Sequence, residues 1–383
     1  MEIDSIDAAR TSVTSAAASA TASTRLLSLD VFRGLTMAAM VVVNNPGDWN
    51  AVYWPLLHAK WHGWTPTDLV FPFFLFIVGV SITLSRKSTS PLAIARRAAI
   101  IFALGLFLNA FPAFDLATWR IPGVLQRIAV CYLIAALLYR ATVGSGRQIA
   151  VLTATIAAML VGYWLVMIGV APPGGVRGDL SAEGNLGAWL DRALMSGHLW
   201  QSRWDPEGVL STVPAIATAL LGVVAGLWIG STRSDADKTR RLALYGLGGV
   251  IGGDLWNLAF PINKALWTSS YVLLTAGLAA LVLAACYWTI DVRRWRGWTT
   301  PFVILGSNAI ALYVLSSLLA STLEAIRVPA AGGHAPLGTL IFSTVFSPLA
   351  PPTGASLLYA LAHLAVLFFL LAWMYRRRVF LRV

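Results

Sequence analysis

Charge and cysteine are both scarce in this chain, and each shortage excludes a class of protein. Of the 383 residues, 12% are charged and 57% are hydrophobic, which leaves too little polar surface to cover soluble domains of this total length. The two cysteines, Cys131 and Cys286, lie inside apolar runs and are too few for a disulfide framework or a structural zinc site. The composition therefore predicts a membrane protein.

The beginning of the chain also lacks an apolar segment. Residues 1–24 are small and polar, so they contain neither a cleaved secretory signal nor a span. We expect a disordered cytoplasmic tail there, then a transmembrane domain at 25–376 and a basic cytoplasmic tail at 377–383. No fixed-period repeat is visible, so neither a solenoid nor an inverted-repeat transporter is indicated.

Long apolar runs make up most of the remaining sequence. A helix needs roughly 20 residues to cross about 30 Å of hydrocarbon, and these runs are continuously apolar instead of alternating like the strands of a membrane barrel. We therefore expect an all-α, polytopic transmembrane helix bundle. Its ten predicted spans are 28–45, 67–85, 96–112, 121–140, 149–171, 209–230, 241–260, 270–290, 300–321 and 355–375.

The distribution of basic residues predicts how the bundle is oriented. The 28 Lys and Arg exceed the 17 Asp and Glu, but they form short clusters between the apolar runs and not the patch or stripe of a nucleic-acid-binding protein. Nineteen lie on one side of the predicted spans and seven on the other, while Arg33 and Arg127 lie within spans. Because positive residues are retained in the cytoplasm, both termini are predicted to be cytoplasmic.

The first predicted outside loop, roughly 45–66, is rich in aromatic residues and contains two histidines. Rings such as Trp61 and Trp64 either form an aromatic belt at headgroup level or stack on the face of a sugar. His58 suits proton transfer, because the unperturbed pKa of histidine is about 6.5, although many interfacial histidines are purely structural. His58 and His62 have the HxxxH spacing of two zinc ligands, but the glutamate of HExxH is missing, so we predict no metal site.

Two polar residues at the ends of spans flank this loop. Asp68 stands third in a helix that can begin with Thr65 and Pro66, so a capping box is a sufficient structural reason for it, and a functional role stays open. Asn44 ends the first span on the outside. It is either an ordinary helix-end residue or placed to orient an imidazole or to donate to a developing oxyanion.

Other polar residues lie within or beside the spans, where each is costly and marks a pathway or a partner. Arg33 can pair with Asp30 on one helical face. A polar cavity that opens outward would explain the rest. With Trp61 and Trp64, we take as candidate substrate-binding residues Gln126, Arg127, Asp254, Asn257, Asn263, Lys264 and Asn308.

Six ordered segments between about residues 25 and 315 resemble the heparan-α-glucosaminide N-acetyltransferase family. They read RLLSLDVFRGLTMAAMVVVNN, LLHAKWHGWTPTDLVFPFFLFIVGVSITLS, RIPGVLQRIAVCYL, DPEGVLSTVPAIATALLGVVAG, FPINKALWTSSYVL and GSNAIALYV. The resemblance implies a multi-pass enzyme that takes acetyl groups from cytoplasmic acetyl-CoA and delivers them to the amine of a terminal glucosamine across the membrane. It places the family's catalytic histidine on His58 and its asparagine on Asn44, and it suggests a homodimer.

Acyl transfer from a thioester to an amine needs a deprotonated amine or a covalent acyl relay, and a stabilised oxyanion. His58 is then either the general base or the acyl-carrying nucleophile. Asn44 would orient its ring or hold the oxyanion, and Asp68 would fix its tautomer. The phosphates of acetyl-CoA should rest among cytoplasmic arginines, for which the candidates are Arg33, Arg96, Arg97, Arg293 and Arg376.

The acceptor and the membrane follow from the same comparison. No extracellular sugar-binding domain is visible, so a small amino sugar or an envelope glycan is the expected acceptor, in a bacterial inner membrane. The rival class is a transporter of amino sugars or other small metabolites, in which the buried polar residues form a substrate path. A non-enzymatic scaffold would leave those polar residues unexplained.

Overall fold

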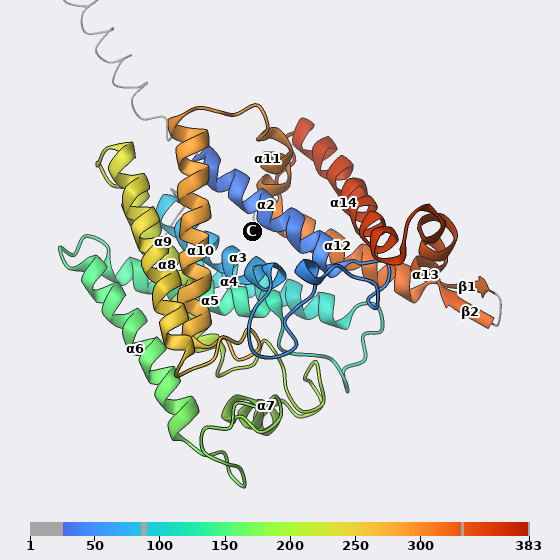
Figure 1. The fold of residues 1–383 in the computed structure, drawn as a ribbon, viewed down its shortest axis with the longest axis horizontal. Coiled ribbons are helices and arrows are strands. Elements are labelled where there is room, and N and C mark those ends of the chain that lie inside the picture. The colour runs from blue at the N-terminus through green and yellow to red at the C-terminus, as the bar shows by residue number, and fades with distance from the viewer. Residues whose placement is uncertain (1–25, 86–89, 331–332, 382–383) are drawn as a thin grey trace, which may run out of the picture.

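The computed structural model describes residues 26–85, 90–330 and 333–381, and most of these are helical (Figure 1). The predicted tail 1–24 lies outside the described residues. The long helices are α2 (Leu27–Asn44), α3 (Val70–Leu84), α4 (Pro91–Ala110), α5 (Val124–Thr142), α6 (Gln148–Gly169), α8 (Thr212–Ile229), α9 (Asp235–Asn257), α10 (Ser269–Cys286), α12 (Ala309–Ala325) and α14 (Pro352–Arg376). The polytopic helical bundle is therefore confirmed.

Shorter elements connect these helices. Helical turns are formed by Trp54–Leu56, Pro66–Leu69, Phe342–Phe346 and Ser347–Leu349, and a π-helical turn, Tyr287–Val292, extends α10. The short helices are α7 (Leu186–Met195), α11 (Thr300–Ser307) and α13 (Leu337–Ile341). A small hairpin pairs β1 (Arg327–Ala330) with β2 (Gly333–Pro336) in antiparallel fashion, which the sequence patterns did not predict.

The number of spans differs from the ten predicted. Among the described residues, eight helices are long and apolar enough to cross a membrane, or up to nine if α11 and α12 together form one bent span. The remaining predicted span, 241–260, corresponds to α9. Charged residues crowd its first two turns and Asp254 lies near its other end, so its apolar stretch is short. It nevertheless packs along α10, where an added Cβ at Gly277 would lie 2.6 Å from the Gly246 carbonyl oxygen.

The predicted ninth span is broken in the middle. Its two halves, α11 and α12, meet at Asn308 with a bend of 79°. Asn308 is buried, and its side-chain amide donates to the Val379 carbonyl (3.1 Å) while its side-chain oxygen accepts from the Leu381 backbone (2.9 Å). The Asn308 side chain thus ties the break to the C-terminal segment, and broken helices of this kind occur where backbone lines a cavity.

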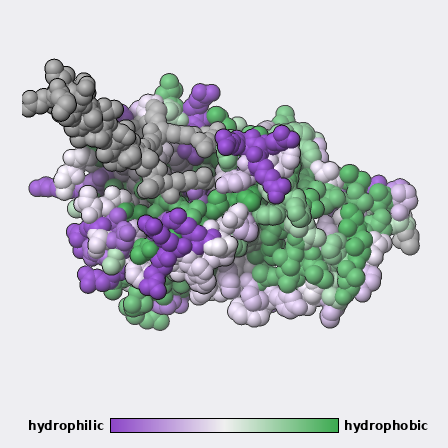
Figure 2. Space-filling view, turned by 90° about the horizontal axis from the view of Figure 1, so that it is seen from above, coloured by the Kyte–Doolittle hydropathy of each residue, from purple (hydrophilic) through white to green (hydrophobic). Residues whose placement is uncertain are grey.

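Two helices form the centre of the core. Helix α3 packs on α8 so closely that an added Cβ at Gly79 would lie 1.9 Å from the Ala219 carbonyl oxygen. Most of α8 is buried, whereas α14 exposes one apolar face with Leu361, Val366, Phe369, Leu370 and Trp373. Figure 2 shows hydrophobic side chains gathered on the half of the molecule that carries α13 and α14 in Figure 1. Such a face suits contact with lipid.

Candidate active site

The loop between α2 and α3 fixes a histidine against a buried carboxylate. The turn Pro66–Leu69 begins with the predicted capping box, in which the Thr65 backbone N–H donates to Asp68 Oδ2 (2.9 Å). The same oxygen accepts from the Ala59 backbone (3.0 Å). The other oxygen, Oδ1, lies 2.7 Å from His58 Nδ1. The Asp68 side chain is 1% exposed and that of His58 is 45% exposed, so a fixed carboxylate holds an accessible imidazole.

A lysine from the loop between α9 and α10 completes this cluster. Lys264 Nζ lies 2.9 Å from His58 Nδ1, 3.2 Å from Nε2 and 3.6 Å from Asp68 Oδ1. Burial lowers the pKa of Lys264 below that of an ordinary lysine, although the carboxylates of Asp68 and Glu207 favour its charged form. The site therefore combines a carboxylate, an imidazole and an ammonium group around one point.

Neighbouring residues hold that loop in place. Asn263 is fully buried, and its side-chain oxygen accepts from the Leu266 backbone (2.9 Å). Its amide nitrogen lies 3.4 Å from His62 Nδ1, which links the second histidine to the loop of Lys264. The Tyr271 hydroxyl donates to the Asp68 carbonyl oxygen (2.5 Å). Asn263 and Tyr271 thus hold the segments that carry Lys264 and Asp68.

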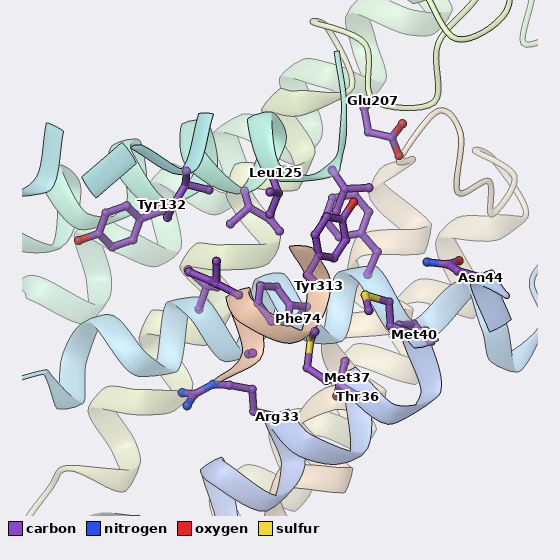
Figure 3. A pocket seen from close by; sticks show the side chains of 18 of the residues that line it. Arg33, Thr36, Met37, Met40, Asn44, Phe74, Leu125, Tyr132, Glu207 and Tyr313 are labelled. Atoms are coloured by element: carbon purple, nitrogen blue, oxygen red, sulfur yellow. The ribbon is translucent and has the colours of Figure 1, made fainter. Parts of the chain in front are cut away.

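A large cavity runs from this cluster through the bundle. Its volume is about 1510 Å³. At one end it is lined by His58, Lys264 and Asn44, and at the other by Arg33 and Arg97. Figure 3 shows Asn44 and Glu207 at one end of this space and Arg33 and Tyr132 at the other. Between the ends the wall is largely apolar, with Met37, Met40, Phe74, Leu125, Ile128 and Tyr313.

The end that contains Arg33 carries two guanidinium groups. Arg33 donates to the Ser81 hydroxyl (2.8 Å) and to Asp30 Oδ1 (3.2 Å), which confirms the predicted pair with Asp30. The Arg97 guanidinium lies over the Tyr132 ring, 5.0 Å from its centroid. Cations held at the mouth of an apolar passage suit a ligand with an anionic head and a long neutral arm.

The connection between α6 and α8 also lines the end that contains His58. Arg120 donates to Asp205 through Nε (2.9 Å) and Nη2 (2.7 Å), and its Nη2 also meets Glu207 Oε2 (2.5 Å). Trp61 from the first loop packs edge-on against Trp204, with centroids 5.3 Å apart. These residues and Trp200 line the cavity except for Asp205, which lies behind the wall.

Comparison with known proteins decides the family. A family model described as heparan-alpha-glucosaminide N-acetyltransferase, catalytic, matches residues 25–180. Heparan-alpha-glucosaminide N-acetyltransferase from Homo sapiens is 32% identical over 352 residues, which cover 76% of this chain and 52% of the human protein. The Mus musculus protein of the same name is also 32% identical, over 76% of this chain and 53% of its own length. The chain belongs to the heparan-alpha-glucosaminide N-acetyltransferase family.

The chain spans about half the length of these two relatives. The segment matched by the family model includes Asn44, His58 and Asp68, and the structure brings His58 and Asp68 into contact. Asn44 ends α2 with an exposed side chain at the same end of the cavity. Its neighbour Asn45 is buried instead and donates to the Val41 carbonyl (2.7 Å).

Three predicted site residues of this family member lie behind the cavity wall. The Gln126 amide donates to the Ile121 carbonyl (3.0 Å). Arg127 is 2% exposed, donates to the Ser211 hydroxyl (2.5 Å), and lies over the Trp267 ring at 5.1 Å. Asn308 lies at the break between α11 and α12. All three residues thus bond other parts of the protein, and none of them lines the cavity.

Other predicted residues lie away from the cavity. Asp254 and Asn257 are exposed on α9, and the Asn257 side-chain oxygen accepts from the Ile262 backbone (2.8 Å). Trp64 is 40% exposed and does not line the cavity, whereas Trp61 does. Of the five arginines expected to meet acetyl-CoA, Arg33 and Arg97 line the cavity. The other three are exposed elsewhere: Arg96, Arg293 and Arg376.

Several cavity residues were missed by the sequence reasoning. Arg120, Trp200, Trp204 and Glu207 line the cavity near His58, yet no role was predicted for them. A partial signal existed, because the DPEG string that includes Glu207 belongs to a segment that carried the resemblance. Among the described residues, no group of three or more His, Cys, Asp and Glu side chains is placed to hold a metal ion.

Proposed function

We propose that this protein is a transmembrane acetyltransferase that moves an acetyl group from cytoplasmic acetyl-CoA to the amine of a glucosamine-type sugar on the periplasmic side. The observation that supports this most is the cavity, which joins the arginines at one end to His58, Asp68 and Lys264 at the other. The predicted orientation places the arginines toward the cytoplasm and His58 outside, in a bacterial inner membrane. A homodimer is expected from the resemblance and needs its own test.

The cavity fits the donor in both shape and charge. Arg33 and Arg97 offer donors to phosphate oxygens. The apolar middle section, lined by Met37, Phe74 and Leu125, accepts a long and nearly neutral arm. Acetyl-CoA supplies an activated thioester, and the protein's task is to hold that thioester beside His58 and to keep water away from it.

At the far end His58 acts on the acceptor amine. Because Nδ1 faces Asp68 Oδ1 at 2.7 Å, Asp68 accepts a hydrogen bond from Nδ1–H and thereby keeps the lone pair of the ring on Nε2. The acceptor arrives as an ammonium group and loses one proton to solvent. The neutral nitrogen attacks the acetyl carbon, and His58 Nε2 takes a second proton from it. The carbon–sulfur bond breaks, the carbon–nitrogen bond remains, and the departing thiolate takes the proton from His58.

Charge develops on the acetyl oxygen during this attack and needs donors. Lys264 Nζ lies 3.2 Å from His58 Nε2, so its N–H groups can reach an oxygen bound beside that nitrogen. Asn44 lines the same end of the cavity and offers an amide donor. Preorganised donors of this kind are commonly the largest single contribution to acyl-transfer catalysis. An alternative in which Nε2 carries the acetyl group uses the same donors.

The rival function, amino-sugar transport, fits the cavity less well. A carrier exposes its site to one side of the membrane at a time, whereas in this chain the cavity extends from His58 to Arg33 and Arg97 in one conformation. Donor and acceptor can therefore meet without a moving carrier.

The test is acetyl transfer from radiolabelled acetyl-CoA to glucosamine by the purified chain in detergent. His58→Ala should lower the rate by about 10²–10⁴-fold, because a positioned base is lost. His334→Ala removes an exposed histidine from β2 and should leave the rate unchanged. Absence of transfer by the native chain, together with intact glucosamine accumulating in proteoliposomes, would overturn the proposal in favour of transport.

A further inference from the structure

Two carboxylates near His58 contact one and the same guanidinium group. Arg120 faces both Asp205 and Glu207. Asp205 is fully engaged: Oδ1 accepts from Arg120 Nη2 (2.7 Å) and the Glu207 backbone (2.9 Å), and Oδ2 accepts from Arg120 Nε (2.9 Å) and the Trp200 backbone (2.7 Å). This bidentate pair already balances the charge of Arg120.

Glu207 is therefore the carboxylate of this group that Arg120 engages through one oxygen only. Its Oε2 meets Arg120 Nη2 at 2.5 Å, while Oε1 has no hydrogen-bond partner among the residues that the structure describes. The side chain is 9% exposed and lines the cavity. A mostly buried carboxylate with a spare oxygen attracts a cation, because desolvated charges are costly unless they are paired.

Glu207 also faces the reaction end of the cavity. Its charge acts on Lys264, the lysine that contacts His58. Figure 3 shows the Glu207 carboxylate at the same end as Asn44 and far from Arg33. A cation bound by Glu207 would thus be held on the side of the cavity where the acetyl group is transferred.

The aromatic rings beside Glu207 suit a ring-shaped ligand. Trp204 is perpendicular to both Trp61 and Trp200, with centroids 5.3 and 5.9 Å away. The Trp61 indole N–H donates to the Leu180 carbonyl (2.8 Å), which fixes that ring. Rigid indole faces next to a carboxylate match a pyranose that carries one positive charge.

We propose that Glu207 binds the ammonium group of the acceptor and thereby selects amino sugars over neutral sugars, with Trp200 and Trp204 packing on the sugar ring. This inference rests on the proposed function and extends it to acceptor choice. A neutral hydroxyl in place of the ammonium would donate a hydrogen bond to Glu207 Oε1 but would bring no positive charge. A hydrogen bond between two charged groups is roughly twice as strong as a neutral one, so the ammonium should bind more tightly than the hydroxyl.

The test compares Glu207→Gln with the native chain and with Glu183→Gln, which removes an exposed carboxylate from the same connection. Glutamine keeps the size of the side chain, and Arg120 keeps its bidentate pair with Asp205. The KM for glucosamine should rise roughly 10- to 100-fold, the loss expected for one charge-assisted hydrogen bond. The kcat at saturating glucosamine and the KM for acetyl-CoA should change much less, and Glu183→Gln should match the native chain.

Inhibition by glucose provides a second measurement, and its first part uses the native chain alone. In the native chain, glucose should inhibit transfer with a Ki at least 10-fold above the KM for glucosamine, and this gap should close in Glu207→Gln. Equal affinity for glucose and glucosamine in the native chain, or an unchanged KM in Glu207→Gln, would overturn the inference while acetyl transfer itself stands. Absence of transfer by the native chain would instead overturn the proposed function.

Discussion

At the scale of single residues, Asp68 joins local folding to the proposed chemistry. The sequence predicted a capping role for Asp68 and left a functional role open. In the structure one carboxylate oxygen caps the helix, and the other contacts the histidine. Oδ2 accepts from the Thr65 and Ala59 backbones, and Oδ1 faces His58. Because the cap fixes the carboxylate, the orientation of the imidazole follows from the start of the helix. Replacing Asp68 would disturb both roles at once.

Lys264→Arg should change how the rate of transfer depends on pH. The pKa of Lys264 lies below that of an ordinary lysine, because burial disfavours the ammonium form. As pH rises through this lowered pKa, the native chain loses the positive charge beside His58, and its rate should fall. Arginine stays protonated throughout that range. The kcat/KM of the variant, whatever its neutral value, should therefore decline less from neutral to alkaline pH.

The control for this profile is Lys238→Arg at the start of α9, which lies outside the cavity lining. It should reproduce the native profile. If Lys264→Arg also declines in parallel with the native chain, the charge of Lys264 does not assist the reaction.

At the scale of elements, the broken pair α11 and α12 shows what hydropathy misses. Both halves are apolar, so the sequence predicts one continuous span, and Asn308 reads as a cavity residue. In the structure its side chain bonds the backbone of Val379 and Leu381 at a 79° bend. The partners of Asn308 at this break lie 71 or more residues away in the chain, and a local window of sequence does not contain them.

The anchoring of α7 gives a prediction about stability. Asp191 is buried on α7 and accepts from the Val209 backbone (2.8 Å), and burial raises the pKa of its carboxyl to about 6. The folded state therefore holds this proton more tightly than the unfolded state. The resulting stability is complete below the unfolded pKa of about 4 and is lost as pH rises through about 6.

Asp191→Asn keeps the acceptor and removes the charge. Between pH 4 and pH 8 the free energy of unfolding of the variant should rise relative to that of the native chain by roughly 1–3 kcal/mol. Thermal unfolding in detergent at several pH values measures this difference. Glu183→Gln, in the same connection but exposed, should show no such divergence. Parallel curves for Asp191→Asn and the native chain would mean that the carboxylate is already neutralised by its surroundings.

At the scale of the whole molecule, the sequence predicted the helices better than the cavity wall. Apolar runs are local, so the places of the helices, the capping box and the pair Arg33–Asp30 could be read directly. Which polar residues face the cavity depends on helix rotation and on contacts across the chain. Gln126 turns to the Ile121 carbonyl, and Glu207 enters the wall because a distant arginine, Arg120, holds its segment there.

The orientation of the whole bundle also rests on sequence alone, and labelling can test it. Ser202 and Thr232 are exposed on either side of α8, and charge counting places the first outside and the second in the cytoplasm. The native cysteines, Cys131 and Cys286, are buried, so the unmodified chain should react little with a membrane-impermeant maleimide. In intact spheroplasts Ser202→Cys should be labelled, and Thr232→Cys should be labelled only after permeabilisation. The reverse pattern would put His58 in the cytoplasm beside the acetyl-CoA pool, and the proposed transfer across the membrane would then have no outer acceptor site.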